Sequence, residues 1–387
     1  MTSLDAVIGT LSLRPGREPS LACERPLVGP ALLGRLTHGR RAALLPDLLG
    51  SLFTLCTHAH RQTARRAVLA ACGRIDAEAE RRRDAQAIAL HTAREHLQRV
   101  AIDWPRMVDG VAQEADAAAW LRDAPVIAMA SATGAARDAA LRDAAAALPG
   151  WLERRLFGMA PADWLARWRS EGGQWLERWS TQHAHPAARV LQAAWPRARA
   201  IGWPSATLDV ADRGESGWRA LATAIAADPG FAGRPQWHGA PAETGPWTRR
   251  GAAQAVGSAW DRLGARLADL ARIAGGAPLD CGALAVAPGE AIAWSEMSRG
   301  LLVHWVRLEA GHNDPAVARI ERVHVLAPTE WNFHPEGGFA RWLAGRRPDG
   351  DGPAVRLAAI ALDPCLDFTI EPARARPALP GPAAGAA

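Results

Sequence analysis

The longest helical signal lies between residues 57 and 100. This stretch holds no Pro and a single Gly, Gly73, and Ala, Arg, Glu and Leu dominate it. These residues favour helix and Gly weakens it, so the pattern predicts one or two long helices with a break near Gly73. A second Ala-rich stretch, 116–148, predicts further helix with breaks at Pro125 and Gly134.

Two later segments repeat apolar residues at the helical period. Residues 258–274 predict an amphipathic helix, because its apolar side chains recur three or four positions apart at Leu263, Leu267, Leu270 and Ile273. Trp recurs at i and i+4 twice, as the pairs Trp164/Trp168 and Trp175/Trp179. This spacing puts each pair on one helix face, which favours an aromatic core or a partner-facing patch over a cofactor site.

Strand signals appear late in the chain. The segments 301–308 and 317–326 are rich in Val, Leu, Ile and Trp and flank a turn-forming cluster at 309–315, which predicts a β-hairpin. Residues 355–362 fit either a short strand or a helix. Together the patterns predict a mainly α fold with minor β-structure, its strands concentrated after residue 290.

The remaining segments predict loops and a tail. Residues 228–247 are rich in Gly and Pro and predict a long loop. Residues 372–387 are a Pro/Ala/Gly-rich sequence, for which we expect a disordered tail. We therefore expect one compact domain over 1–371.

Composition excludes several classes of function. The 387 residues include no Lys, so all 45 basic residues are Arg, which removes the Lys that a P-loop or a pyridoxal Schiff base requires. The net charge of +5 is spread over interleaved Arg and acidic residues, which argues against nucleic-acid binding. No basic leader precedes an apolar segment, and no uncharged apolar run approaches the ~20 residues of a membrane helix, so we expect no signal peptide and no membrane insertion.

The five cysteines are sparse, and the nearest two, Cys56 and Cys72, lie sixteen positions apart. That spacing excludes a disulfide scaffold and a CxxC zinc ribbon, and it favours a reducing, cytoplasmic setting. Two short segments offer chemistry. One is 55–60 (LCTHAH), where Cys and His lie close enough to bind a soft metal, and the other is 362–368 (LDPCLDF). Taken singly, each segment is compatible with a buried, non-functional Cys as well as with a functional site. The histidines of 183–185 (HAH) are compatible with a surface position.

The two segments together resemble the terminal motifs of the nickel–iron hydrogenase large subunit. That family has an early RxCGxCxxxH motif before a long helix, and residues 51–60 (SLFTLCTHAH) align with it without a gap. Cys56 matches the family's second Cys and His60 its His, while Phe53 replaces the first Cys. The closing DPCxxCxxH motif resembles 363–371 (DPCLDFTIE), which keeps the first Cys as Cys365.

Three segments between these ends strengthen the resemblance. Residues 241–249 (PAETGPWTR) are similar to the family's PxEVGPLAR segment. Residues 296–300 (EMSRG) with 304–305 (HW) resemble its EAPRG…HW segment, which carries an active-site Arg, here Arg299. Residues 328–332 (PTEWN) resemble its PTTWN segment. The resemblance therefore covers most of the chain, and it implies the large-subunit fold of long helices around a core with a β-hairpin near 301–326.

The departures from the family argue against hydrogenase catalysis. Catalytic members hold nickel and iron with four Cys thiolates, whereas this chain keeps two and has Phe53 and Phe368 at the other positions. The family's proton-relay Glu aligns with Gly34, and Glu371 replaces the closing His beside which the family is cleaved. The pattern instead resembles the hydrogenase expression/formation proteins of the HupK (HoxV) type. That resemblance implies no enzymatic activity but a role in hydrogenase maturation.

The resemblance implies a site as well as a role. Cys56 and Cys365 are expected to converge and hold one iron fragment with cyanide and carbonyl ligands, transiently and without nickel, before its delivery to the hydrogenase large subunit. Arg299 is expected to donate a hydrogen bond to a cyanide ligand, with His60 and Asp363 beside the metal ligands. Expected partners are hydrogenase maturation proteins and the large subunit itself.

Three alternatives remain open on the sequence. Both cysteines could be inherited and inert in a buried core. The protein could be a protein-only chaperone that mimics the large subunit and recruits maturation proteins through surfaces at 151–180 and around Trp237, because Trp is favoured at interfaces. It could also be a hydrolase or redox protein that uses Cys56 with His58 or His60.

Overall fold

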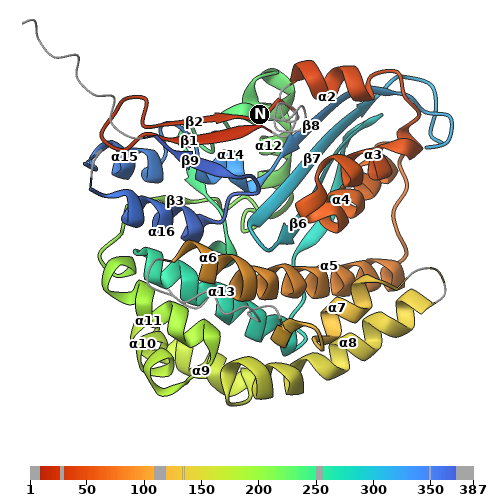
Figure 1. Cartoon of the computed structure of the whole chain (residues 1–387). Helices are drawn as coiled ribbons and strands as arrows, with labels where there is room; N and C mark the ends of the chain where they lie inside the picture. Colours follow the sequence, from red (N-terminus) through yellow and green to blue (C-terminus); the bar gives the residue numbers. More distant parts are fainter. Residues whose placement is uncertain are drawn as a thin grey trace, which may run out of the picture.

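The computed structural model describes residues 9–26, 30–108, 119–132, 134, 136–249, 256–347 and 350–371, and it is mainly helical (Figure 1). The longer helices are α2 (Pro30–Thr37), α3 (Leu45–Leu52), α4 (Thr57–Ala71), α5 (Glu78–Gln98), α8 (Ala136–Leu152), α9 (Pro161–Glu171), α10 (Gly173–Gln182), α11 (Pro186–Ala198), α12 (Gly214–Ala227), α13 (Ala259–Ala274) and α16 (Gly352–Leu362). Shorter helices are α6 (Trp104–Met107), α7 (Pro125–Ala130), α14 (Pro328–Asn332) and α15 (Gly338–Ala344). The strands are β1 (Thr10–Leu13), β2 (Leu21–Glu24), β3 (Ala206–Thr207), β4 (Ala242–Glu243), β5 (Cys281–Ala287), β6 (Glu290–Met297), β7 (Gly300–Leu308), β8 (Ile320–Leu326) and β9 (Phe368–Ile370).

A four-stranded antiparallel sheet in the order β5-β6-β7-β8 forms the centre of one half of the molecule. The predicted hairpin is confirmed as β7 and β8, which pair Val303 with Leu326 and Val306 with Val323. The preceding hairpin of β5 and β6 was not predicted, and β5 begins before residue 290. Its sequence, CGALAVA, consists largely of small side chains with weak strand propensity, and much of it is exposed at the sheet edge.

Helices cover both faces of this sheet. On one face α4 packs through small side chains, and the Thr63 hydroxyl donates to Ser295 of β6 over 2.8 Å. On the other face Trp218 of α12 stacks on Trp294 of β6, with ring centroids 3.9 Å apart. Cover on both sides explains why the central strands β6 and β7 are buried along nearly their whole length rather than at alternate residues.

The second half of the molecule is a group of helices around α13, which lies beside α5 below the sheet in Figure 1. Almost every residue of α13 is buried, and Ser258 caps its first turn through a hydrogen bond from the backbone N–H of Asp261. The two Trp pairs lie on α9 and α10 inside this core, where Trp164 and Trp168 stack with ring centroids 6.0 Å apart. The core interpretation of these pairs is therefore confirmed.

The same burial contradicts the contact surfaces suggested for a protein-only chaperone. Trp151, Trp164, Trp168, Trp175 and Trp179 are each at most 4% exposed, and Trp237 is 8% exposed. Side chains that are already packed in the core cannot contribute the large apolar contact that makes Trp effective at an interface.

A three-stranded sheet in the order β2-β1-β9 joins the two ends of the described chain. β1 and β9 run parallel, with Leu11 opposite Phe368. Glu371, at the position of the family's closing His, forms an ion pair with Arg14 across this sheet over 2.8 Å. This pairing brings the segment around Cys365 next to β2 and the residues that follow it.

The other predicted elements are largely confirmed. The long helical stretch is two helices, α4 and α5, which are separated near Gly73, where φ is +69°. Helices α7 and α8 begin at Pro125 and just after Gly134, and residues 355–362 belong to a helix, α16. The tail at 372–387 and residues 116–118 lie outside the described residues. Among the described helices, none alone is long and apolar enough to cross a membrane, although the bent pair Ala42–Leu52 and Thr54–Ala71 passes that test jointly.

Candidate thiol site

The structure brings Cys56 and Cys365 together from opposite ends of the sequence. Cys56 ends a single 3₁₀ turn immediately before α4, and Cys365 lies in the turn between α16 and β9. Both are buried free thiols, 3% and 8% exposed. Burial raises the pKa of the Cys56 thiol well above its ordinary value, the Arg299 guanidinium partly lowers it, and the nearby Cys365 thiol raises it further. The expected convergence of the two cysteines is thus seen in the fold, while metal binding by them stays a prediction.

Thr329 at the start of α14 holds the Cys365 side in place. The backbone N–H of Cys365 donates to the Thr329 hydroxyl over 3.2 Å, and the Thr329 hydroxyl lies 2.9 Å from the Cys365 sulfur. Because the hydroxyl oxygen accepts from the backbone, its proton is free to be donated to the sulfur. A hydrogen bond of this kind stabilises a thiolate more than a thiol.

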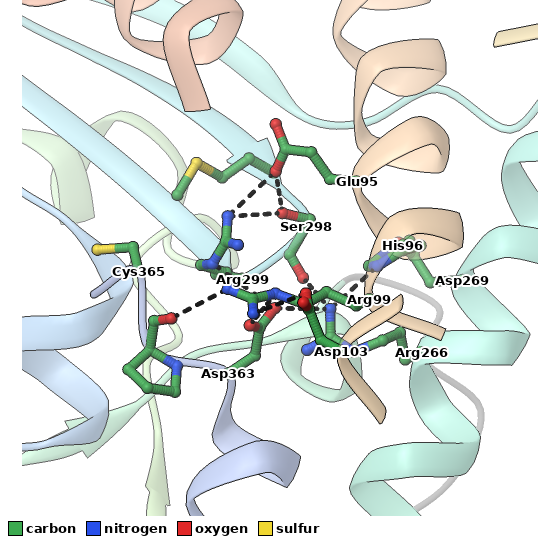
Figure 2. Close-up of polar contacts among 12 residues, drawn as sticks. Glu95, His96, Arg99, Asp103, Arg266, Asp269, Ser298, Arg299, Asp363 and Cys365 are labelled. Atoms are coloured by element: carbon green, nitrogen blue, oxygen red, sulfur yellow. Dashed lines mark hydrogen bonds and ion pairs between the residues drawn. The ribbon is translucent and has the colours of Figure 1, made fainter. Parts of the chain in front are cut away.

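Asp363 is the centre of the charged cluster beside Cys365. Its carboxylate lies 2.7 Å from Arg99 Nε, 3.0 Å from Arg266 Nη1 and 3.6 Å from Arg299 Nε, as Figure 2 shows. Burial by itself raises the pKa of Asp363, but these three guanidinium groups outweigh it and lower the pKa to about 2. The carboxylate is therefore ionised at neutral pH.

The backbone at Asp363 is strained, and the cluster fixes it. Asp363 has φ +57° and ψ +71°, the left-handed region that a non-Gly residue rarely occupies, at the C-terminus of α16. Arg99 also donates to the carbonyl of the next residue, Pro364, over 3.3 Å. The ion pairs thus set the direction in which the chain leaves α16, and with it the position of Cys365.

Arg299 connects this cluster with the two thiols. It lies between Glu95 Oε2, 3.2 Å from its Nη1, and Asp363. Although burial lowers the pKa of Arg299, the charges of Asp363 and Glu95, followed by those of Cys56 and Cys365, raise it, so the guanidinium stays charged. Within the described part of the chain Nη2 has no hydrogen-bond partner. Arg299 is the residue for which the sequence resemblance implies a hydrogen bond to a cyanide ligand, and that role stays a prediction.

Arg25 is a second guanidinium at the site, which the sequence analysis missed. It follows β2, is buried, and forms an ion pair with Glu330 over 2.6 Å. Burial lowers its pKa, whereas the charges of Cys365, Glu330, Cys23 and Cys56, in that order, raise it. Arg25 therefore lies within electrostatic range of three thiols. Nothing in the sequence around it distinguishes it, because only the β1–β9 pairing brings it here.

The substitution at position 53 fills the site with an aromatic ring. Phe53 stacks on His60 with ring centroids 4.0 Å apart and an interplanar angle of 6°. His60 Nδ1 lies 3.1 Å from His304 Nε2, and burial lowers the pKa of both imidazoles, so both are neutral at pH 7. Phe53 thus occupies apolar space at the place of the family's first thiolate, and His60 packs against it.

The segments that carried the resemblance interlock around the site. Glu243 forms a two-point ion pair with Arg262 of α13, at 2.7 and 3.1 Å, and the backbone of Thr244 exchanges two hydrogen bonds with the Asn332 amide. Gly300 has φ +128°, and a Cβ there would lie 2.7 Å from the Thr244 hydroxyl oxygen. These motif residues therefore hold the fold together around the thiols.

A further network lies behind the cluster on α5 and α13. His96 Nε2 lies 2.8 Å from Asp269, and Arg266 donates to His96 Nδ1 over 3.0 Å, which places the imidazole proton on Nε2. Burial lowers the pKa of His96 to about 4, so it is neutral. Arg249 completes the network through Asp269 and Glu296.

A cavity of about 360 Å³ opens beside the cluster. Its lining includes Glu95, Arg299, Asp363 and Phe368, the last at the position of a lost family thiolate. Within the described ranges no three His, Cys, Asp or Glu side chains are arranged to hold a metal ion. The arrangement offers two soft thiol ligands and a charged wall, and it suits a metal fragment that brings its own further ligands.

The buried thiol also bears on the hydrolase or redox hypothesis. At pH 7 we expect alkylation of Cys56 by iodoacetamide to be at least about a hundredfold slower in the folded iron-free protein than in denaturant, because burial keeps the sulfur protonated and enclosed. Mass spectrometry of timed samples measures this rate for each cysteine. Rapid alkylation of Cys56 in the folded protein would instead indicate an activated nucleophile.

Comparison with curated proteins identifies relatives of nearly the same length. No protein-family model matches the chain. The chain is 38% identical to the hydrogenase expression/formation protein HoxV of Cupriavidus necator, over 96% of this chain and 97% of that protein. It is 30% identical to the hydrogenase expression/formation protein HupK of Rhizobium leguminosarum bv. viciae, over 94% and 96%.

Comparison with solved structures supports the fold independently. A chain of the NiFeSe hydrogenase of Dm. baculatum superposes with a TM-score of 0.52 and 15% identity, covering 89% of this chain and 93% of that one. A second structure of the same enzyme gives a TM-score of 0.51. The fold is that of the nickel–iron hydrogenase large subunit, as the motifs predicted. Together with the relatives, it places this chain in the HoxV/HupK family of hydrogenase expression/formation proteins.

Proposed function

We propose that this protein is a non-catalytic scaffold that holds an iron fragment with cyanide and carbonyl ligands for delivery to a hydrogenase large subunit. The observation that carries the proposal is that Cys56 and Cys365, the two cysteines that remain at the family's four positions, are buried within electrostatic range of each other and of two buried guanidinium groups. The relatives' names, hydrogenase expression/formation protein, agree with a role in maturation rather than in catalysis.

The charge of the site supports this cargo. An Fe(II) centre with two cyanides, one carbonyl and two thiolates is a dianion, and a buried anion requires compensating cations. Arg25 and Arg299 both lie within electrostatic range of the two thiols. Metal binding displaces the thiol protons, so the raised pKa of Cys56 makes loading cost free energy and makes protonation assist release.

The number of ligands supports transient binding. With Phe53 and Phe368 at two of the family positions, a fragment is held by two sulfur bonds, and fewer bonds must break when it leaves. Soft thiolates suit low-valent iron, and we expect no nickel, because the thiolates that would complete a nickel site are absent from this sequence. The cavity that Arg299 lines also touches Leu55, Pro364 and Leu366, the chain neighbours of the two cysteines. In the proposed complex Arg299 Nη2 donates to a cyanide nitrogen.

A maturation assay tests the role. In a strain that lacks the native gene, we expect the Cys56→Ala/Cys365→Ala variant to leave hydrogenase activity at the level of the deletion. The matched control is Cys72→Ala/Cys281→Ala, which replaces a buried cysteine just after α4 and a half-buried one on β5, and it should restore activity. Full activity with the first variant, at equal protein level, would favour a protein-only chaperone that recruits maturation proteins or the large subunit without iron.

A further inference from the structure

A second cavity, of about 540 Å³, shares Leu55 and Glu95 with the first one and has not been assigned a role. It lies among α4, α5, α7 and α8, and its volume falls in the range of small-molecule sites, roughly 300–1,000 Å³. We call it the basic cavity because Arg61, Arg94 and Arg137 line it.

The charge on its wall is poorly compensated. Among the described residues of its lining Glu95 is the only acidic one, and its carboxylate is already bound to Ser298 and Arg299. Arg94 has no hydrogen-bond or ion-pair partner among the residues that the structure describes. Arg61 pairs with Asp47 over 3.0 Å, but the two side chains are 46% and 79% exposed, so solvent weakens that pair.

His58 adds an oriented donor rather than charge. His58 and His91 stack with ring centroids 4.0 Å apart. Arg137 Nη2 lies 3.4 Å from His58 Nδ1, and because a guanidinium can only donate, that nitrogen accepts and the proton lies on Nε2. Nε2 is buried and has no partner in the described part of the chain. Its N–H is a donor without an acceptor.

The N-terminus of the helix that carries His58 also favours a negative charge in the basic cavity. The basic cavity touches Thr57 and His58 in the first turn of α4, a 15-residue helix with no acidic residue in that turn. The unpaired backbone N–H groups of such a turn favour a negative charge nearby. A further wall is apolar, with Ile127, Met129 and Leu141 from α7 and α8.

We propose that the basic cavity binds a small organic oxyanion, a phosphate or carboxylate group attached to an apolar body. The anion would lie against Arg94, Arg137 and the His58 N–H, and the body against the apolar wall. Arginine is well suited to phosphate and carboxylate oxygens, which its planar guanidinium can bind at two points. The proposal does not depend on iron at the thiol pair.

Calorimetry on the full-length, iron-free protein tests this with two probes that share an aromatic body, phenyl phosphate and phthalate. We expect saturable binding of at least one, weakened about tenfold or more in Arg94→Gln and in Arg137→Gln, which each remove a charged hydrogen bond. Arg82→Gln, on the same helix but 78% exposed and paired with Glu78, is the matched control and should bind like the wild type.

The probes also separate the sources of the anion. Tighter binding of phenyl phosphate indicates a phosphate ligand, and tighter binding of phthalate a carboxylate. Inorganic phosphate binding as tightly as phenyl phosphate would overturn the apolar part of the site. No saturable binding of either probe at millimolar concentration, or binding that is unchanged in both cavity variants, would overturn the proposal altogether. Because the Cys56→Ala/Cys365→Ala variant should bind the probes normally, this result is independent of the scaffold role.

Discussion

Replacement of Asp363 by Ala is expected to lower the free energy of unfolding by about 3–5 kcal/mol, because it removes the ion-pair carboxylate of buried Arg266 and one of the two that Arg299 contacts. Arg266 and Arg299 are only 1% and 3% exposed and both pair with this carboxylate. The variant Asp363→Asn separates the contribution of the charge from that of the backbone conformation. Asn tolerates the left-handed conformation at φ +57°, whereas the negative charge is lost. Chemical denaturation of both variants measures the two contributions, and Asn should recover only a small part of the loss.

The charge effect has a defined pH dependence. The pKa of Asp363 is lowered from an ordinary value of 3.8 to about 2 by its three guanidinium neighbours, against the effect of burial. A carboxylate with a lowered folded-state pKa stabilises the protein above its unfolded pKa and loses that contribution as the pH falls through the folded value. About 2 kcal/mol is involved at 1.36 kcal/mol per pKa unit. The deficit of Asp363→Asn should therefore shrink between about pH 4 and 2, and a deficit independent of pH would contradict the ion-pair account.

Replacement of Glu243 by Ala is expected to cost a similar amount, about 3–5 kcal/mol, although this residue touches neither thiol. Glu243 binds Arg262 at two points and accepts from Trp203 Nε1 over 3.0 Å, while the Arg262 guanidinium lies over the Trp203 ring, 4.2 Å from its centroid. Removal of the carboxylate leaves a guanidinium of 1% exposure without its partner. Thermal and denaturant unfolding measure the loss.

Two further variants check the mechanism of that effect. Glu215→Ala removes an exposed ion pair with Arg219 on α12 and should change stability by no more than about 0.5 kcal/mol. The double variant Glu243→Ala/Arg262→Met should be more stable than Glu243→Ala alone, since it removes the unpaired charge as well. If Glu243→Ala behaved like the exposed control, the motif residue would have no structural role.

The sequence predicted the fold class because its strongest patterns are local or belong to recognisable motifs. The helices at 57–100 and 258–274 follow from period and composition, and the hairpin of β7 and β8 from its apolar strands and turn cluster. The β5–β6 hairpin was not predicted, because the sequence of Cys281–Ala287 shows no clear alternation of apolar and polar residues. The role suggested for the Trp-rich segment as a contact surface was wrong, because periodicity defines a helix face but not what covers it.

The site was predictable only in part for a similar reason. Cys56, Cys365, Arg299 and Asp363 could be named because they match motif positions, and the structure places them together. Arg25 and Thr329 contact the same site through tertiary pairing, with no local signal beyond the PTEWN segment for Thr329. The position of the Arg25 guanidinium at the site depends on the parallel pairing of β1 with β9, which joins positions more than three hundred residues apart.

Infrared spectroscopy with iron analysis tests the central claim most directly. The protein is purified without oxygen from cells that co-express the maturation machinery, as wild type, Cys56→Ala, Cys365→Ala and the control Cys72→Ala. The account predicts cyanide and carbonyl bands with iron but no nickel in the wild type and in Cys72→Ala, and loss of the bands in each of the other two variants. Absence of the bands from every preparation, while hydrogenase maturation still requires the protein, would contradict it.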